Sequence, residues 1–67
     1  MTKRSIRIFG HETSLSLEDE FWEELRSIAF EQKITITKLL EQIDNKKTGN
    51  LSSALRLFVL KYMKEKS

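Results

Sequence analysis

The sequence predicts a mainly α-helical protein that begins with a short β-ribbon. Three observations predict this fold class. Apolar and polar residues alternate over residues 4–17, apolar residues then recur at helical spacing in three stretches, and a polar loop over residues 45–50 separates the last two stretches. Because the chain has only 67 residues, we expect a single domain over residues 1–67.

Two short strands are expected near the N-terminus, over about residues 4–9 and 12–17. Apolar residues occupy even positions in the first strand and odd positions in the second. The change of parity falls at Gly10 and His11. A one-residue shift of this kind indicates a bulge or a tight turn between the two strands.

Three helices are expected after the strands, over about residues 18–32, 36–45 and 51–64. Each carries an apolar stripe with the three- and four-residue spacing of an amphipathic helix. Carboxylates fill the first turn of the first helix, where the helix dipole favours negative charge. Thr35 and Asn50 stand where a side-chain oxygen would cap the second and third helices.

A core built from one such short chain would be marginally stable, because a domain of this size buries only about 60% of the surface that its unfolded chain exposes. The sequence contains no cysteine, and its single histidine cannot supply the ligands of a zinc site. We therefore expect no metal and no cofactor. Oligomerisation is the remaining source of stability, so a homodimer is expected.

Charge is distributed unevenly along the chain. Residues 1–11 contain bases and no acid, residues 12–24 contain acids and no base, and the remainder is mostly basic. This segregation can orient a molecule toward a polyanion, although ordinary solvated helix faces give the same pattern. The apolar runs are far shorter than the roughly 20 residues that cross a bilayer, and no signal-peptide pattern is present. We expect a cytoplasmic protein that does not contact membranes.

Catalytic chemistry has little support in this sequence. His11 is the only histidine, and beside Gly10 it is better interpreted as a turn residue than as a general base. No glycine-rich phosphate loop is present. The carboxylates from Glu18 to Glu24 are interpreted as a solvated helix face, because a short chain offers little concave surface that could raise a pKa by burial. We therefore expect no enzymatic activity.

Several short motifs occur in a characteristic order along the chain. They are Arg4-Ser5-Ile6, Gly10-His11, Thr13-Ser14, Leu17-Glu18, Phe21-Trp22, Ile43-Asp44 and Asn50-Leu51-Ser52-Ser53-Ala54-Leu55-Arg56. This order resembles that of a bacterial subfamily of ribbon-helix-helix proteins with an additional third helix. The resemblance covers nearly the whole chain. It implies a homodimer in which strands of two subunits pair antiparallel into a ribbon for the DNA major groove, and pairing would also close an otherwise unpaired strand edge.

The resemblance also implies a DNA-binding face on the ribbon. Ser14 and Ser16 would point outward and reach base edges in the groove. Upstream of them, Arg4 and Arg7 are expected to make groove contacts, since the planar guanidinium suits guanine, and Lys3 is expected to contact phosphate.

Glu12 would share the outward face, at a position where the resemblance implies a basic residue. A carboxylate there would repel phosphate unless it accepts a hydrogen bond from a cytosine amino group. A second contact is implied at the start of the second helix, where free backbone N–H groups and the dipole favour an anion. Thr35, Thr37 and Lys38 occupy that position, and the two threonines would also be found there as simple caps.

The resemblance places a set of apolar residues in the core of the dimer. Trp22 is a candidate interface anchor because it lies beside the main stripe of its helix, although partial burial in a single chain would suit it equally. The expected dimer core comprises Leu15, Leu17, Phe21, Trp22, Leu25, Ile36 and Leu40.

Two functional hypotheses follow from the sequence. The first is a homodimeric, sequence-specific protein that binds double-stranded DNA and acts as a small transcriptional regulator. The alternative is a protein-interaction module, such as an antitoxin or an adaptor dimer. Such a module would bind a protein partner through the surface of its third helix.

Overall fold

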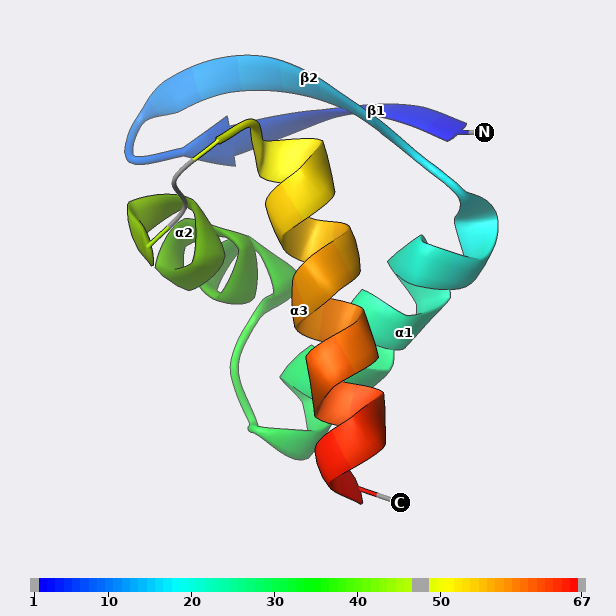
Figure 1. Ribbon diagram of the computed structural model, residues 1–67. Coiled ribbons are helices and arrows are strands. Elements are labelled where there is room, and N and C mark those ends of the chain that lie inside the picture. The colour runs from blue at the N-terminus through cyan, green and yellow to red at the C-terminus, as the bar shows by residue number, and fades with distance from the viewer. Residues whose placement is uncertain (1, 47–48, 67) are drawn as a thin grey trace.

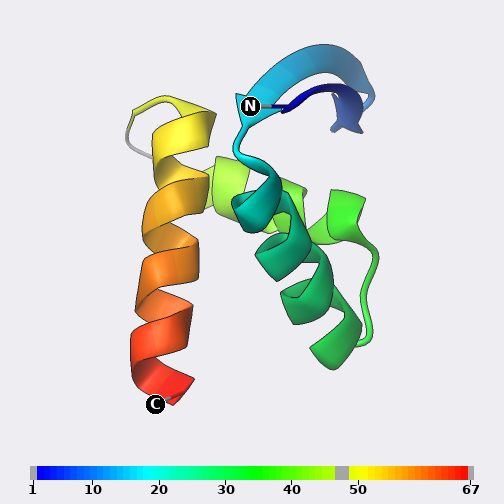
Figure 2. The same ribbon diagram turned by 90° about the vertical axis from the view of Figure 1, so that its right-hand side faces the viewer.

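The structure is a computed structural model that describes residues 2–46 and 49–66. A two-stranded antiparallel sheet precedes three helices, which confirms the predicted mainly α fold class with an N-terminal ribbon. Figure 1 shows the hairpin lying across one end of the helical layer, and Figure 2 shows α3 standing beside α1. The elements are β1 (Thr2–Ile8), β2 (His11–Leu17), α1 (Asp19–Glu31), α2 (Ile36–Lys46) and α3 (Leu51–Lys66).

The two strands pair with each other within the chain, whereas the sequence resemblance placed a second subunit beside the strand. Ile8 lies opposite His11 next to the turn, and Thr2 lies opposite Leu17 at the far end. Directly opposed residues share one face of a sheet, so even positions of β1 lie with odd positions of β2. The parity shift in the sequence therefore marks a two-residue turn. This turn lets β1 fold back and form backbone hydrogen bonds with one edge of β2.

Both residues of this turn have positive φ angles, as a type I′ hairpin requires. Gly10, at φ 81°, adopts this conformation without a Cβ penalty, whereas Phe9, at φ 53°, is a bulky residue in the left-handed region. The backbone N–H of Phe9 donates a 2.9 Å hydrogen bond to Oε2 of Glu41 on α2. This bond holds the strained turn against the helical layer.

Two substitutions in the turn are expected to change stability in opposite directions. Phe9→Asn should raise the free energy of unfolding by about 1 kcal/mol, because asparagine tolerates positive φ and the phenyl ring is 56% exposed. Gly10→Ala should lower it by about 1–2 kcal/mol through backbone strain alone, since an added Cβ would meet no atom within 4 Å. Urea denaturation of the two variants tests both signs, and a Phe9→Asn variant less stable than the wild type would contradict this description of the turn.

The apolar core lies between the inner face of the hairpin and the three helices. Within the part of the chain that the structure describes, no buried side chain is polar or charged. The core is contributed by both strands and all three helices, so it forms from one chain. Its members are Ile8, Leu15, Leu17, Trp22, Leu25, Ile28, Ala29, Leu39, Leu40, Ile43, Leu55 and Val59.

The residues expected in a dimer core are therefore largely enclosed already. Leu15, Leu17, Trp22, Leu25 and Leu40 are buried in the single chain, and Phe21 and Ile36 are half-buried. The physical reason is that β1 and α3 cover surfaces that the sequence resemblance gave to a second subunit. Burial of these side chains does not require a dimer.

The end of α1 is defined by a residue in the left-handed conformation. Lys33 has a φ of 59°, and its N–H donates to the carbonyl of Phe30 at 3.1 Å. The next N–H, of Ile34, donates to the carbonyl of Ala29 at 3.0 Å. These two bonds form a Schellman motif, which satisfies the last carbonyls of the helix and turns the chain toward α2.

The starts of α2 and α3 carry the two side-chain caps predicted from the sequence. Oγ1 of Thr35 accepts a 3.1 Å hydrogen bond from the N–H of Lys38, and Oδ1 of Asn50 accepts a 2.8 Å bond from the N–H of Ser53. Both bonds satisfy backbone N–H groups that a helix leaves without an internal partner. Of the loop expected between these helices, residues 47 and 48 lie outside the described residues.

A bidentate ion pair joins α3 to the start of α1. Nε and Nη2 of Arg56 donate to Oε1 and Oε2 of Glu18 at 3.0 and 3.2 Å. The pKa of Glu18 is lowered from its ordinary value, first by a hydrogen bond from its own backbone and then by hydrogen bonding to the Arg56 guanidinium. The ionised carboxylate is therefore the form that fastens the third helix to the first.

Glu18→Gln is expected to lower the urea midpoint at neutral pH and to lower it less in acid. Because the folded-state pKa lies below the ordinary value of 4.5, the stabilisation by Glu18 is present above that value and is lost as the pH falls through the folded-state pKa. Urea curves for both proteins at pH 7 and at about pH 3 measure this difference, with Glu23→Gln as a control at an exposed residue of α1. A difference that is equally large at both pH values would contradict the assignment.

A second polar cluster fastens the far end of α3 to the end of α1. The hydroxyl of Tyr62 donates to Oε2 of Glu31 at 2.7 Å, and the ammonium of Lys66 donates to Oε1 of the same carboxylate. Hydrogen bonding to Lys66 and then to Tyr62 lowers the pKa of Glu31, and hydrogen bonding to Glu31 raises the pKa of both Tyr62 and Lys66. Together with the Glu18 ion pair, the cluster fixes α3 along the length of α1.

Candidate nucleic-acid interface

The outer face of the hairpin is a polar surface built by the strand register. It comprises Lys3, Ser5 and Arg7 from β1 together with Glu12, Ser14 and Ser16 from β2. Lys3 lies opposite Ser16, Ser5 opposite Ser14, and Arg7 opposite Glu12. All six side chains are exposed, because the opposite face of each strand packs against the helices. We call these six residues the outer face.

One ion pair crosses the outer face near the turn. Nη2 of Arg7 lies 3.5 Å from Oε1 of Glu12, and the two side chains are 69% and 79% exposed. An exposed pair at this distance is worth little energy and opens readily. The guanidinium of Arg7 can therefore leave Glu12 for another acceptor, such as a phosphate or a guanine edge.

Arg4 lies on the other side of the hairpin from Arg7. Residues three apart in a strand point to opposite faces, and the register puts Arg4 opposite Leu15. Its guanidinium carbon is 5.3 Å from the ring centroid of Trp22, which is a cation–π contact. The two arginines that the sequence grouped as groove-contacting residues are thus separated, and the two-residue period of the strand already contained the signal for this.

Trp22 connects the hairpin to α1. The side chain is 3% exposed, and its Nε1–H donates to the backbone carbonyl of Thr2 at 3.2 Å. The hydroxyl of Thr2 in turn donates to a carboxylate oxygen of Asp19 in the first turn of α1. These contacts fix the N-terminal end of the hairpin over the helix and so set the direction in which the outer face points.

The residues expected to contact phosphate at the start of α2 form a separate group. Thr35, Thr37 and Lys38 are all exposed. The Thr35 hydroxyl is engaged as the helix cap, and the Lys38 side chain extends from the first turn. The structure therefore gathers Lys3, Arg7, Ser14 and Ser16 on one surface and leaves the α2 group on another element.

Ser5 is an outer-face residue to which sequence reasoning gave no role. It lies directly opposite Ser14, at the middle of the hairpin, and is exposed. Its position follows from the same alternation that places Lys3 and Arg7 outward. A register could not be assigned before the turn was known, so the pairing of Ser5 with Ser14 was not predicted.

Over residues 2–46 and 49–66, no three histidine, cysteine or carboxylate side chains are grouped closely enough to hold a metal ion. No helix in these ranges is both long enough and apolar enough to span a bilayer. The outer face itself is a surface of hydroxyls and charges, which makes contacts through hydrogen bonds and ion pairs.

Comparison with known proteins identifies the family of this architecture. A family model described as a ribbon-helix-helix domain matches residues 1–63. The solved structure of an uncharacterized protein from Bordetella pertussis Tohama I is similar, with a TM-score of 0.77 and 32% sequence identity. That alignment covers 92% of this chain, and this chain spans 54% of that protein's length. No match was found among curated proteins.

Members of the matched family are generally DNA-binding transcriptional regulators or antitoxins, they are typically not enzymes, and they typically bind DNA as dimers. The hairpin followed by helices, the additional C-terminal helix and the near-complete coverage by the family model agree with one another. This chain belongs to the ribbon-helix-helix domain family.

Proposed function

We propose that this protein is a sequence-specific DNA-binding protein, a small transcriptional regulator that places its hairpin in the major groove. The observation that carries the proposal is the exposed outer face, which presents three hydroxyls, two cations and one carboxylate and no apolar side chain. A two-stranded ribbon fits the roughly 12 Å width of the major groove. Side chains that point away from the helical layer would then meet base edges.

Different outer-face residues are suited to different contacts. Arg7 can offer its planar fork to the O6 and N7 acceptors of guanine. Ser14 and Ser16 can donate to or accept from several base edges, so each discriminates weakly. Lys3, at the open end of the hairpin, is placed to contact a phosphate at the groove margin.

A second anchoring point is proposed at the first turn of α2. Helix N-termini favour anions because their backbone N–H groups and the dipole point outward. Thr37 and Lys38 are exposed there and would reinforce a phosphate contact, while Thr35 continues to cap the helix. Such contacts would fix the position of the protein on the duplex without reading sequence.

We further propose that the protein binds DNA as a homodimer in the cytoplasm. Each chain supplies one two-stranded hairpin. A twofold dimer would present two ribbons and so recognise a palindromic site with two half-sites. Members of the family typically bind DNA as dimers, which supports this proposal.

The test of the proposal is a DNA titration at several salt concentrations. A duplex enriched from a random library by the wild-type protein serves as the ligand, and Arg7→Ala is compared with Arg26→Ala, an exposed arginine on α1. Arg7→Ala is expected to cost about 1–3 kcal/mol of binding free energy on the enriched duplex, whereas Arg26→Ala should cost little. Absence of binding by the wild type at about 50 mM salt, where electrostatic attraction is strong, would refute the proposal.

Glu12→Gln is expected to strengthen DNA binding. The change removes a carboxylate from the outer face and releases Arg7 from its 3.5 Å ion pair. We expect affinity at low salt to rise by about threefold to tenfold, and the salt dependence to steepen by about one unit if Arg7 then neutralises a phosphate. Fluorescence anisotropy measures both quantities. A loss of affinity confined to the enriched duplex would contradict this expectation and indicate instead that Glu12 accepts from a cytosine amino group.

A further inference from the structure

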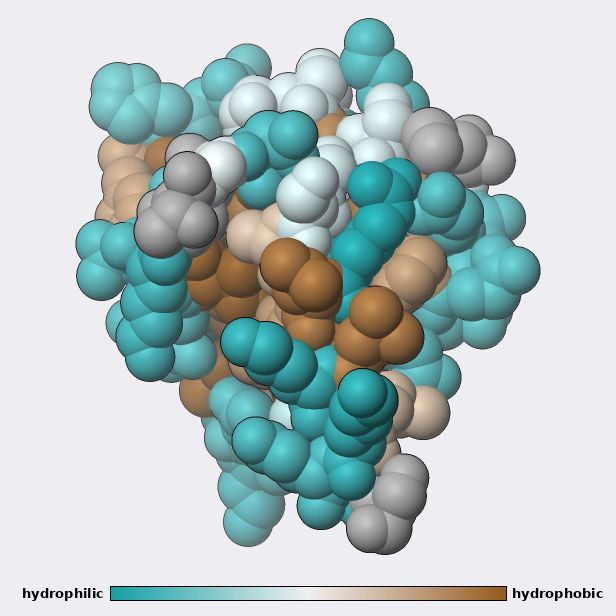
Figure 3. Space-filling view, viewed as in Figure 1, coloured by the Kyte–Doolittle hydropathy of each residue, from teal (hydrophilic) through white to brown (hydrophobic). Residues whose placement is uncertain are grey.

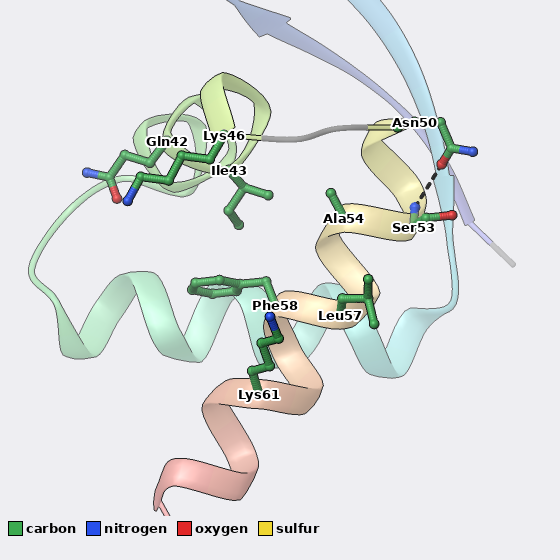
Figure 4. Close-up of a pocket in the computed structure, with 10 residues that line it drawn as sticks. Gln42, Ile43, Lys46, Asn50, Ser53, Ala54, Leu57, Phe58 and Lys61 are labelled. Atoms are coloured by element: carbon green, nitrogen blue, oxygen red, sulfur yellow. Dashed lines mark hydrogen bonds between the residues drawn. The ribbon is translucent and has the colours of Figure 1, made fainter.

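A groove with an apolar floor runs between α2 and α3, away from the outer face. Its cavity volume is about 460 Å³. The floor is formed by Ile43 of α2 and by Ala54, Leu57 and Phe58 of α3. Figure 4 shows Ile43 and the ring of Phe58 approaching the groove from its two walls, and Figure 3 shows apolar surface gathered below the hairpin.

The groove contains apolar side chains whose exposure is not required by the packing of α3 against the core. Leu57 is 57% exposed, whereas Leu55 and Val59 on the opposite side of the same helix are buried. An α-helix that packs on one face only usually carries polar residues on the other. A leucine kept at the solvent-facing side of α3, beside a half-buried phenylalanine, is typical of a surface that another molecule covers.

The charge around the groove is of one sign. Lys46 on the α2 wall and Lys61 on the α3 wall both line it, and none of the described residues that line it carries a carboxylate. A partner that fills the groove would therefore be favoured by acidic side chains at its edges.

The dimensions of the groove match a helix. Its lining residues on α3 extend from Ser53 to Lys61, a distance of about 12 Å at about 1.5 Å per residue. Three apolar side chains at positions i, i+4 and i+7 of a docked helix span about 10 Å and would lie within that length. Helix-in-groove recognition of this kind relies on a few such anchors.

A second copy of this chain does not offer a suitable helix within the described residues. Phe30 is the one exposed large apolar side chain on α1, and α2 presents none. The outer side of α3 exposes Leu57 and Leu60. It also exposes two lysines, Lys61 and Lys64, against one acid, Glu65, so mainly lysines would face the lysines of the opposing groove. Like charges brought together in this way disfavour self-association through the groove.

We propose that the groove between α2 and α3 is a docking site for an amphipathic helix of another protein, with an apolar stripe for the floor and acidic residues beside the two lysines. The site is distinct from the outer face, which lies on the hairpin at the end of the helical layer in Figure 1. The protein could then hold DNA and a protein partner at once. This proposal does not depend on the DNA-binding proposal, and its test uses no DNA.

The test selects helix-forming peptides from a displayed random library against the full chain. The selected peptides are expected to carry apolar residues at positions i, i+4 and i+7 and acidic residues on either side of this apolar stripe. Their affinity should fall about tenfold or more in Leu57→Ser, because the buried leucine is lost, and about fivefold in Lys61→Glu. Leu60→Ser and Lys64→Glu are the matched controls, since these residues lie on the same helix outside the groove lining, and Leu60 is 54% exposed.

Several outcomes would overturn the proposal. One is a selection that returns no peptide above the background of a bare surface, or only peptides without acidic enrichment. Equal binding to Leu57→Ser and Leu60→Ser would show that the groove is not the site. Sedimentation that gives a dimer for the wild type and for Leu60→Ser but a monomer for Leu57→Ser would assign the groove to a second copy. Circular dichroism of each variant confirms that the exposed substitutions leave the fold intact.

Discussion

Trp22→Ala is expected to remove a large part of the protein's free energy of unfolding. Removing a buried tryptophan side chain costs about 3–5 kcal/mol, and a domain of this length has a total stability of only about 3–10 kcal/mol. Trp22 is 3% exposed, donates a hydrogen bond to the carbonyl of Thr2 and lies under the guanidinium of Arg4. The loss would therefore both open the core and release the hairpin from α1.

Urea denaturation followed by circular dichroism measures this effect. Phe30→Ala is the matched control, because Phe30 is an aromatic residue of the same helix that is 83% exposed. The control should change the free energy of unfolding by no more than about 0.5 kcal/mol. A Trp22→Ala variant with a stability near that of the control would contradict the description of the core.

Ser14→Glu is expected to reduce DNA affinity by about tenfold or more at low salt without altering stability. The residue lies at the middle of the outer face, opposite Ser5, and is exposed. A carboxylate placed there would enter the major groove between two rows of phosphates, and juxtaposed like charges cost several kcal/mol, or about a hundredfold in affinity, when contact is close.

Ser27→Glu controls for the change in net charge, because Ser27 is an exposed residue of α1 that lies on no strand. Anisotropy titrations of the two variants on the same enriched duplex give the comparison. Ser27→Glu should lose much less affinity than Ser14→Glu. Equal losses of affinity would mean that binding depends only on the net charge of the protein and that the hairpin does not contact the DNA.

Local patterns in the sequence predict the order of the elements well. The two-residue alternation before Gly10 and after it predicts the strands, and the apolar stripes predict the three helices because each must bury one face. The caps at Thr35 and Asn50 were predicted because an oxygen-bearing side chain directly before an apolar stripe is a helix-start signal. These features all depend on residues that are close in the chain.

The partner of each strand was harder to predict. A free strand edge can be closed by the same chain or by another, and the sequence pattern is the same in both cases. In the structure, β1 pairs with one edge of β2 through a tight turn. Phe9 adopts a positive φ in this turn, and phenylalanine, unlike glycine or asparagine, is not a residue type that predicts such a conformation. The separation of Arg4 from Arg7 does not depend on this register, because the two-residue period of a strand already puts residues three apart on opposite faces.

The long-range polar contacts could not be predicted from the sequence. Glu18 contacts Arg56 and Glu31 contacts Tyr62 because α3 lies along α1. The apolar stripe of a helix predicts which of its faces is buried, but it does not predict which other helix packs against that face. The groove between α2 and α3 has the same origin. The third helix was expected from the sequence as a possible surface for a protein partner, and the packing of α3 determines where that surface is.

The measurement that tests the central proposal most directly is a titration of ¹⁵N-labelled protein with the enriched duplex, followed by two-dimensional NMR. We expect the largest shifts and broadening on the strands that carry Lys3, Ser5, Arg7, Ser14 and Ser16, with smaller changes at the start of α2 and almost none along α3. Perturbations concentrated on α3, with the hairpin resonances unmoved by saturating DNA, would contradict the proposal.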